Sequence, residues 1–194
     1  MAGEGSAATV TGNKTDTGGF YPLSINPAGK VLRGDYLSDG KLVLFLGLPG
    51  ALGVLAQPGD VIPGAPSPID ELGVASFTDN SAAPINGDGR AVFGARFSGD
   101  SYFSLLVGAT ASLSIAAQPG MQAPGRPPGI TFTFIDLQTA SLREQDRILF
   151  QANDTATDNV NVGIYAGLLG NLALVARSGD QAVGTGPGVF YDIQ

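Results

Sequence analysis

The chain contains no cysteine and no histidine among its 194 residues. Without cysteine it has no disulfide, no thiolate zinc site, no iron–sulfur cluster and no cysteine nucleophile. Without histidine it lacks the most common general base and the most common side-chain ligand of transition metals. A conventional Ser–His–Asp triad is therefore excluded. We expect a protein that is not an enzyme and carries no cofactor.

Positive charge is also scarce. Lysine occurs three times, and ten basic residues stand against 17 acidic ones, which gives a net charge of −7. No basic stripe is available to neutralise phosphates, so we expect neither nucleic acid nor an anionic membrane surface as a partner. The longest apolar stretch, residues 42–56, is interrupted by three glycines and a proline, which predicts no membrane insertion.

Glycine and proline are abundant, with 29 and 13 residues, and hydrophobic residues make up 43% of the chain. Glycine and proline disfavour helices. The hydrophobic content is too high, and the 14% of charged residues too low, for a disordered chain. The composition therefore predicts a turn-rich, all-β protein that is long enough to bury a sizeable core.

The sequence contains a tandem repeat. An Ala-x-x-Gly motif ends at Gly59, Gly120 and Gly179, which are 61 and 59 residues apart. In every copy another glycine precedes the motif alanine by nine residues, and Pro-Gly or Val-Gly begins four residues after the motif glycine. Such agreement identifies repeat units. We place them at residues 17–60, 74–121 and 130–180, with a partial fourth unit at 181–194, in a single domain of residues 1–194.

Four phenylalanines follow the same period. Phe20, Phe77, Phe134 and Phe190 are separated by 57, 57 and 56 residues. We expect each to lie in the first strand of its unit, and their spacing marks them as residues of the core or of a seam between units. Residues 188–193 would then form a thirteenth strand, beyond the twelve strands of three complete units.

Each unit divides into four short strands rich in Val, Ile, Leu, Phe and Tyr and bounded by turn residues. The second, third and fourth strands are expected at residues 30–37, 42–46 and 52–56, at 90–97, 102–107 and 113–117, and at 147–152, 160–166 and 172–176. Residues 141–144 carry the capping-box pattern of a helix start. The repeat register places a turn and a strand there, so we expect at most one helical turn.

Four-stranded units of about 57 to 60 residues have the size of a β-propeller blade. We predict an all-β fold of tandem, four-stranded antiparallel repeats that are propeller-blade-like. The alternative is threefold closure within the chain, as in a β-trefoil or β-prism, which leaves the additional strand unexplained. Open strand edges are templates for pairing with another chain, so we expect the chain to assemble with copies of itself into a ring or a fibre.

The strand that ends in Ala-x-x-Gly-Asp, the following Pro-Gly, the aromatic strand and the Ile-Asn-x-x-Gly turn resemble bacterial secreted tandem-repeat proteins of unknown function. The resemblance covers nearly the whole chain and is specific at four positions: Asn26, Asp60, Asn86 and Asp180. Met121 and Arg143 depart from the pattern at the equivalent positions. The resemblance implies a β-propeller-like fold and an exported, non-catalytic scaffold, located outside the cell or on its surface. The first residues of the chain lack the basic and apolar regions of a signal peptide.

The tripeptide Arg33-Gly34-Asp35 spells the integrin-recognition sequence. The repeat register puts it inside a strand, where both charged side chains lie on one face of a sheet. Receptor binding needs a displayed loop, so the pattern predicts a local ion pair instead.

Acidic loops that contain asparagine suggest calcium, because the ion prefers oxygen ligands. Asp154 and Asp158 are the candidate ligands. No loop matches the EF-hand or the calcium-binding nonapeptide, and asparagine, aspartate and glycine are also what tight turns require. We favour turns over a metal site.

Asp60 and Asp180 recur after the fourth strand, where an aspartate typically caps backbone amides. A pair of carboxylates from two copies is the arrangement used in glycoside hydrolysis, but nothing in the sequence brings two of them together, and we assign no catalytic residue. The sequence predicts a non-enzymatic extracellular scaffold that self-associates through exposed strand edges. The alternative is a glycan-binding module with one shallow site per repeat, in which aromatic rings stack on sugars.

Overall fold

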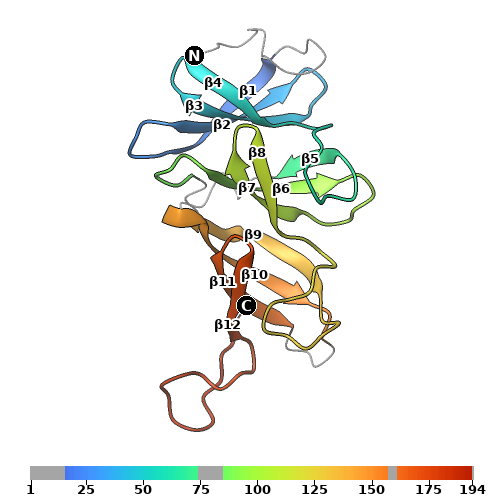
Figure 1. The fold of residues 1–194 in the computed structure, drawn as a ribbon, viewed down its shortest axis with the longest axis vertical. Helices are drawn as coiled ribbons and strands as arrows, with labels where there is room; N and C mark the ends of the chain where they lie inside the picture. The colour runs from blue at the N-terminus through green and yellow to red at the C-terminus, as the bar shows by residue number, and fades with distance from the viewer. Residues whose placement is uncertain (1–15, 74–84, 157–160, 194) are drawn as a thin grey trace.

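The computed structural model describes residues 16–73, 85–156 and 161–193. They form three four-stranded antiparallel sheets, each with its strands in chain order (Figure 1). Sheet 1 consists of β1 (Asp16–Ile25), β2 (Val31–Leu37), β3 (Leu42–Leu48) and β4 (Ala51–Ala56). Sheet 2 consists of β5 (Ile69–Gly73), β6 (Ala91–Phe97), β7 (Ser104–Ala109) and β8 (Ser112–Ala117). Sheet 3 consists of β9 (Phe132–Arg143), β10 (Arg147–Asp154), β11 (Val162–Leu168) and β12 (Asn171–Arg177).

The predicted all-β class and the four-stranded antiparallel units are confirmed. Each predicted second, third and fourth strand is present, with ends within two residues of the expected ones. The first strand of the second unit was expected around Phe77, which lies outside the described residues; β5 begins at Ile69. A short 3-10 segment, η1 (Glu144–Asp146), precedes β10, and two of its residues have positive φ angles. The expected turn followed by a strand is confirmed, and the capping-box pattern at 141–144 starts no helix, since β9 extends to Arg143.

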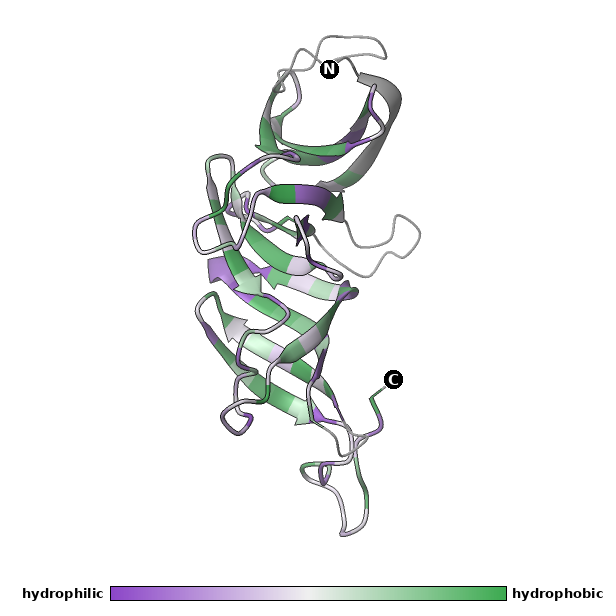
Figure 2. Cartoon of the chain, turned by 90° about the vertical axis from the view of Figure 1, so that its right-hand side faces the viewer, coloured by the Kyte–Doolittle hydropathy of each residue, from purple (hydrophilic) through white to green (hydrophobic). Residues whose placement is uncertain are grey.

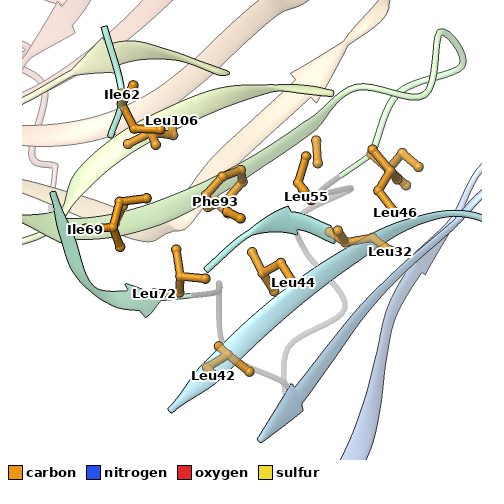
Figure 3. Packing of buried hydrophobic residues seen from close by; sticks show 14 of the residues in the cluster. Leu32, Leu42, Leu44, Leu46, Leu55, Ile62, Ile69, Leu72, Phe93 and Leu106 are labelled. Atoms are coloured by element: carbon orange, nitrogen blue, oxygen red, sulfur yellow. The ribbon is translucent and has the colours of Figure 1, made fainter. Parts of the chain in front are cut away.

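The three sheets are stacked face to face, with sheet 2 in the middle (Figure 1). The strands are mostly hydrophobic, and the polar residues gather in turns and loops (Figure 2). Between sheets 1 and 2, Leu32 and Leu44 pack with Phe93 and Leu106 in one apolar cluster (Figure 3). All four side chains are at most 2% exposed. Burial of each contributes about 2 kcal/mol relative to exposure.

The opposite face of sheet 2 is equally apolar. Because successive residues of a strand point to opposite faces, Val92 points away from sheet 1 while its neighbour Phe93 points toward it. Val92 and Leu105 join a second cluster with Phe150 and Tyr165 of sheet 3. Sheet 2 is therefore buried on both faces.

The glycine that precedes each Ala-x-x-Gly motif by nine residues lies at the end of the third strand of its unit. A Cβ on Gly47, Gly108 or Gly167 would collide with the main-chain oxygen of the first residue of the fourth strand. Glycine is therefore required for the close approach of the two strands in this hairpin, which explains the recurrence of this residue.

The Ile-Asn-x-x-Gly turns connect neighbouring sheets. The Asn26 side chain accepts a hydrogen bond from the Lys30 N–H (2.9 Å) within its own turn. Its amide donates to the main-chain oxygens of Asn86 (3.0 Å) and Gly87 (3.2 Å) in the turn of sheet 2. The Asn86 amide in turn donates to the Arg143 oxygen (3.1 Å) in sheet 3. Asn26 and Asn86 are 5% and 4% exposed, and these bonds form a ladder of buried and part-buried contacts along the stack.

The third turn ends the ladder. Arg143 occupies the position of the asparagine, and the following Glu144 accepts a hydrogen bond from the Gly87 N–H through its Oε1 atom (3.0 Å). The next two residues, Gln145 and Asp146, have φ angles of 60° and 56°. The third turn thus accepts hydrogen bonds from the second turn. It lacks the asparagine that would donate to a further turn.

A second main-chain contact fixes the loop after each fourth strand. The Gly59 N–H donates to the Ile69 oxygen (2.7 Å), and the Ile69 N–H donates to the Asp60 oxygen (2.9 Å). In the second and third copies, Phe132 and Tyr191 make the equivalent pair of main-chain hydrogen bonds. Ile69 and Phe132 are the first residues of β5 and β9, so the contact sets where the next sheet begins.

The position of this contact shows that the predicted period of phenylalanines is wrong at its last member. Tyr191, and not Phe190, is the equivalent of Phe132, and Phe190 makes an isolated bridge with Gln181. Residues 188–193 form no strand, so the prediction of a thirteenth strand is wrong: their main chain bonds to residues 178–182 of the preceding loop. Phe134 lies in β9 as expected and is 43% exposed; its ring lies 5.8 Å from the Tyr102 ring of the preceding unit, so it is a seam residue. Phe190 is 58% exposed and is not a core residue.

Within the described ranges the sheets form an open stack, with sheets 1 and 3 at its two ends and no closed barrel (Figure 1). The alternative of threefold closure is therefore not found. The described part of the chain includes no helix that is long and apolar enough to cross a membrane.

The ladder gives a first prediction. Asn86→Ala removes the bond to the Arg143 oxygen and the bond that the Arg90 N–H donates to the Asn86 side chain (2.9 Å). Because both partners then lose a hydrogen bond in a partly buried setting, we expect the free energy of unfolding to fall by about 1 to 2 kcal/mol. Urea denaturation measures this loss. The exposed Asn171→Ala is the control, and equal stability of the two variants would contradict a structural role for the ladder.

Candidate interaction surfaces

The fourth strand of each unit lies at an edge of its sheet. β4, β8 and β12 each have a hydrogen-bonded strand on one side only in the described sheets. β4 and β8 contain no charged residue, and β12 contains one, Arg177, at its last position. Proteins usually protect such edges with charges or proline inside the strand. The first strand of sheet 2 follows that rule, since Asp70 and Glu71 lie within β5.

A second open surface is the face of sheet 3 turned away from sheet 2, which we call the sheet 3 outer face. Large apolar side chains on this face are 41–60% exposed: Leu149, Leu168 and Val175. The sequence analysis did not identify this surface. Its apolar residues resemble their buried equivalents in sheet 2, and the available signal was Gln151, which takes the place of Gly94 on this face.

The predicted ion pair in the Arg-Gly-Asp tripeptide is confirmed. Both charged residues lie in β2, where Arg33 Nε contacts Asp35 Oδ1 at 2.5 Å. Arg33 and Asp35 are 6% and 3% exposed. An integrin-type receptor cannot reach side chains buried in this way.

The calcium candidate Asp154 is engaged by other groups. Its Oδ2 atom accepts a hydrogen bond from Arg126 Nε (2.7 Å), and its Oδ1 atom accepts one from the Ala156 N–H (2.9 Å). The pair fastens the loop before β9 to the end of β10, with side-chain exposures of 10% for Arg126 and 2% for Asp154. Asp158 lies outside the described residues. No cluster of three or more carboxylates able to hold a metal ion occurs in the described ranges.

The recurring aspartate has the expected capping contact in the first copy. Asp60 Oδ2 accepts a hydrogen bond from the Gln57 N–H (2.9 Å), at the corner after β4. Asp180 lies 3.8 Å from Arg177 Nη1. Met121 keeps the main-chain bond of this corner, from its N–H to the Gln118 oxygen (3.0 Å), without a carboxylate. The corner therefore forms in the second copy without the side-chain cap.

Two shallow hollows lie beside the edge strands. One, of about 590 Å³, is lined by residues of β4, the loop after it and the β7–β8 hairpin. The other, of about 740 Å³, lies along β8 and is also lined by the loop after it and by Pro63 and Gly64 of the β4–β5 loop. The described residues that line them are aliphatic, small or polar and include no aromatic ring. They lack the flat aromatic surface on which a sugar stacks.

Tyr165 is a buried tyrosine that the sequence analysis did not single out. The Tyr165 ring lies 4.9 Å from the Phe132 ring and 5.7 Å from the Phe150 ring. Tyr165 is 0% exposed, and its hydroxyl finds no hydrogen-bond partner in the described part of the chain. Burial, reinforced by the Asp154 carboxylate, raises the pKa of Tyr165 to about 12. The equivalent residues are Phe45 in the first copy and Leu106 in the second, so a hydroxyl at a position that is apolar in the other copies is the signal that was available.

In a comparison with protein families, residues 1–194 match a model described as a family of unknown function, DUF7453. The chain belongs to this family. No curated protein and no solved structure matches it. The surfaces just described are therefore the features of this DUF7453 chain that bear on its function.

The buried tyrosine gives a second prediction. At neutral pH, Tyr165→Phe should be at least as stable as the wild type, because it removes a buried hydroxyl without breaking a hydrogen bond among the described residues. As the pH rises above about 10, unfolded tyrosine ionises while folded Tyr165 resists up to about 12, so the wild type loses stability that the variant keeps. Urea denaturation of both proteins across this range tests the effect. Parallel pH profiles would contradict it.

Proposed function

We propose that the chain is a non-enzymatic structural protein, an extracellular β-repeat scaffold that self-associates through its exposed strand edges. The observation that carries the proposal is the row of edge strands β4, β8 and β12, which have almost no charge. An edge strand presents unpaired main-chain donors and acceptors, and pairing with a second strand satisfies them. The extracellular location rests on the resemblance to secreted repeat proteins.

The arrangement of the sheets supports a propeller-like reading of the stack. Four antiparallel strands in chain order, with each sheet packed by its face on the next, is the relation between neighbouring blades of a propeller. Three such sheets leave an open arrangement. Association of two chains would double the number of sheets, and a contact that does not close would give a fibre.

The non-enzymatic reading is supported by ionisable side chains that pair with one another in the described part of the chain. Arg33 pairs with Asp35, Arg126 with Asp154, and Arg90 with Asp146 at 2.7 Å. The glycan-binding alternative rests on a smaller hollow of about 260 Å³, which Tyr36 lines together with Asp70, Glu71 and Arg96. The two hollows beside β4 and β8 offer no aromatic ring among the described residues. Binding of sugars stays a prediction that a glycan array would test.

The edge proposal is tested by the molar mass in solution. We expect the wild type, with a chain mass of 19.6 kDa, to form oligomers whose mass rises with concentration in light scattering on a sizing column. Ala51, Ser112 and Asn171 are exposed and begin the three edge strands. Lysine at all three should reduce the mass toward that of the monomer, because like charges oppose edge pairing.

The control adds the same charge away from the edges, at the exposed residues Ser38, Ser101 and Val183. This triple lysine variant should associate like the wild type. A wild type that is monomeric at every concentration would overturn self-association. If the lysines on β4, β8 and β12 leave the molar mass of the oligomer unchanged, the edge mechanism is overturned.

A further inference from the structure

The strand registers identify equivalent residues in sheets 2 and 3. Phe93 pairs with Leu106 between β6 and β7, and Phe150 pairs with Tyr165 between β10 and β11. These two pairs align the strands of sheet 2 with those of sheet 3. Three of the aligned positions lie on the face of each sheet that is turned toward the C-terminal end of the stack. Val92, Leu105 and Val107 of sheet 2 correspond to Leu149, Ile164 and Ala166 of sheet 3.

The two sets differ in what covers them. Val92, Leu105 and Val107 are 4%, 0% and 0% exposed because sheet 3 packs on them. In sheet 3 the equivalent Leu149 is 43% exposed. The sheet 3 outer face is thus equivalent to a face of sheet 2 that is covered within the chain, and it carries apolar residues at the same three positions. Apolar surface of this kind is stabilised by a second sheet.

At the opposite end of the stack, the middle of the outward face of sheet 1 is buried. Val43 and Phe45, on the face of sheet 1 turned away from sheet 2, are 0% and 7% exposed. The ion pair of Arg33 and Asp35 lies on the same face and is also buried. A second copy therefore cannot offer the middle of this face as the partner of an exposed sheet 3.

The sheet 3 outer face also lacks the features of the internal stacking geometry. In sheet 2, Gly94 lies so close to Leu137 of sheet 3 that a Cβ would collide with it. The equivalent residue of sheet 3 is Gln151, whose side chain prevents the same approach. Arg143 replaces the asparagine that extends the ladder. These two changes disfavour a further sheet stacked head to tail in the internal geometry.

We infer that the sheet 3 outer face packs against the same face of a second copy, as a two-fold symmetric dimer. A two-fold contact uses one surface twice, so it needs neither the buried face of sheet 1 nor the internal geometry. The interface centres on β10 and β11 and contains Leu149, Ile164, Ala166 and Leu168. This contact is separate from the edge pairing proposed above, and it rests on the same premise that the chain associates with its own copies.

The experiment places lysine on the two central strands of this face, at Leu149 and Leu168. Both side chains are more than 40% exposed, so the folded chain tolerates the change. We expect sedimentation equilibrium to show dimerisation weakened at least about tenfold, because two charges would be buried in an apolar contact. The matched control is lysine at Ile25 and Leu48, which are 67% and 50% exposed in sheet 1; Leu48 is the equivalent of Leu168. It should dimerise like the wild type.

A second measurement uses the absence of cysteine. Single-cysteine variants at Leu149, Gln151 and Ala166 have no other thiol to react with. A two-fold axis through this face brings one of these positions near its own symmetry mate, and a disulfide forms when the Cβ atoms are about 4 Å apart. We expect oxidation to give a covalent dimer in at least one of the three variants and none with Ile25→Cys.

The outcomes separate the two proposals. If the lysines at Leu149 and Leu168 leave the mass unchanged and no cysteine crosslinks, while the edge lysines dissociate the oligomer, the face contact is overturned and edge association stands. If the face lysines dissociate it and the edge lysines do not, the face contact stands and the edge mechanism falls. A monomeric wild type would overturn both, and the face would then be free for another partner.

Discussion

Sheet 2 is apolar on both faces, and the rest of the molecule depends on covering them. Phe93 and Leu106 require sheet 1 on one side, and Val92 and Leu105 require sheet 3 on the other. A sheet with two apolar faces is stable only between two layers. The stack is thus the smallest arrangement that buries the central repeat, and the repetition leaves an apolar face at the end of sheet 3.

Polar contacts set the alignment of the layers that apolar packing brings together. Hydrophobic burial is not directional, whereas the amides of Asn26 and Asn86 donate to specific oxygens of the next turn. The main-chain bonds of Ile69 and Phe132 fix where β5 and β9 begin. Glycine at positions such as Gly108 lets the third and fourth strands approach closely. Each repeat thus carries its own core residues and its own alignment devices.

The surfaces proposed for assembly are what such a stack leaves incomplete. Edge strands with almost no charge keep main-chain groups available, and the sheet 3 outer face keeps apolar area available. The two surfaces differ in chemistry: the edge offers directional hydrogen bonds, and the face offers burial. Replacement of the ladder asparagine by Arg143, and Gln151 in place of glycine, distinguish the outer face from the internal ones.

The strands, the turns and the repeat were predictable because their signals are local: alternating apolar residues, hairpin glycines and recurring offsets determine a four-stranded unit. The ion pair of Arg33 and Asp35 was predictable too, since residues two apart in a strand share a face. The aromatic period misplaced Phe190, because spacing does not report which main-chain groups pair. The partner of Asp154 was also hidden, since Arg126 lies 28 residues away on a loop. The sequence by itself thus determined the repeat and its apolar faces. Only the tertiary structure decided which of those faces are covered, because burial depends on which layers meet and not on the residues of one strand.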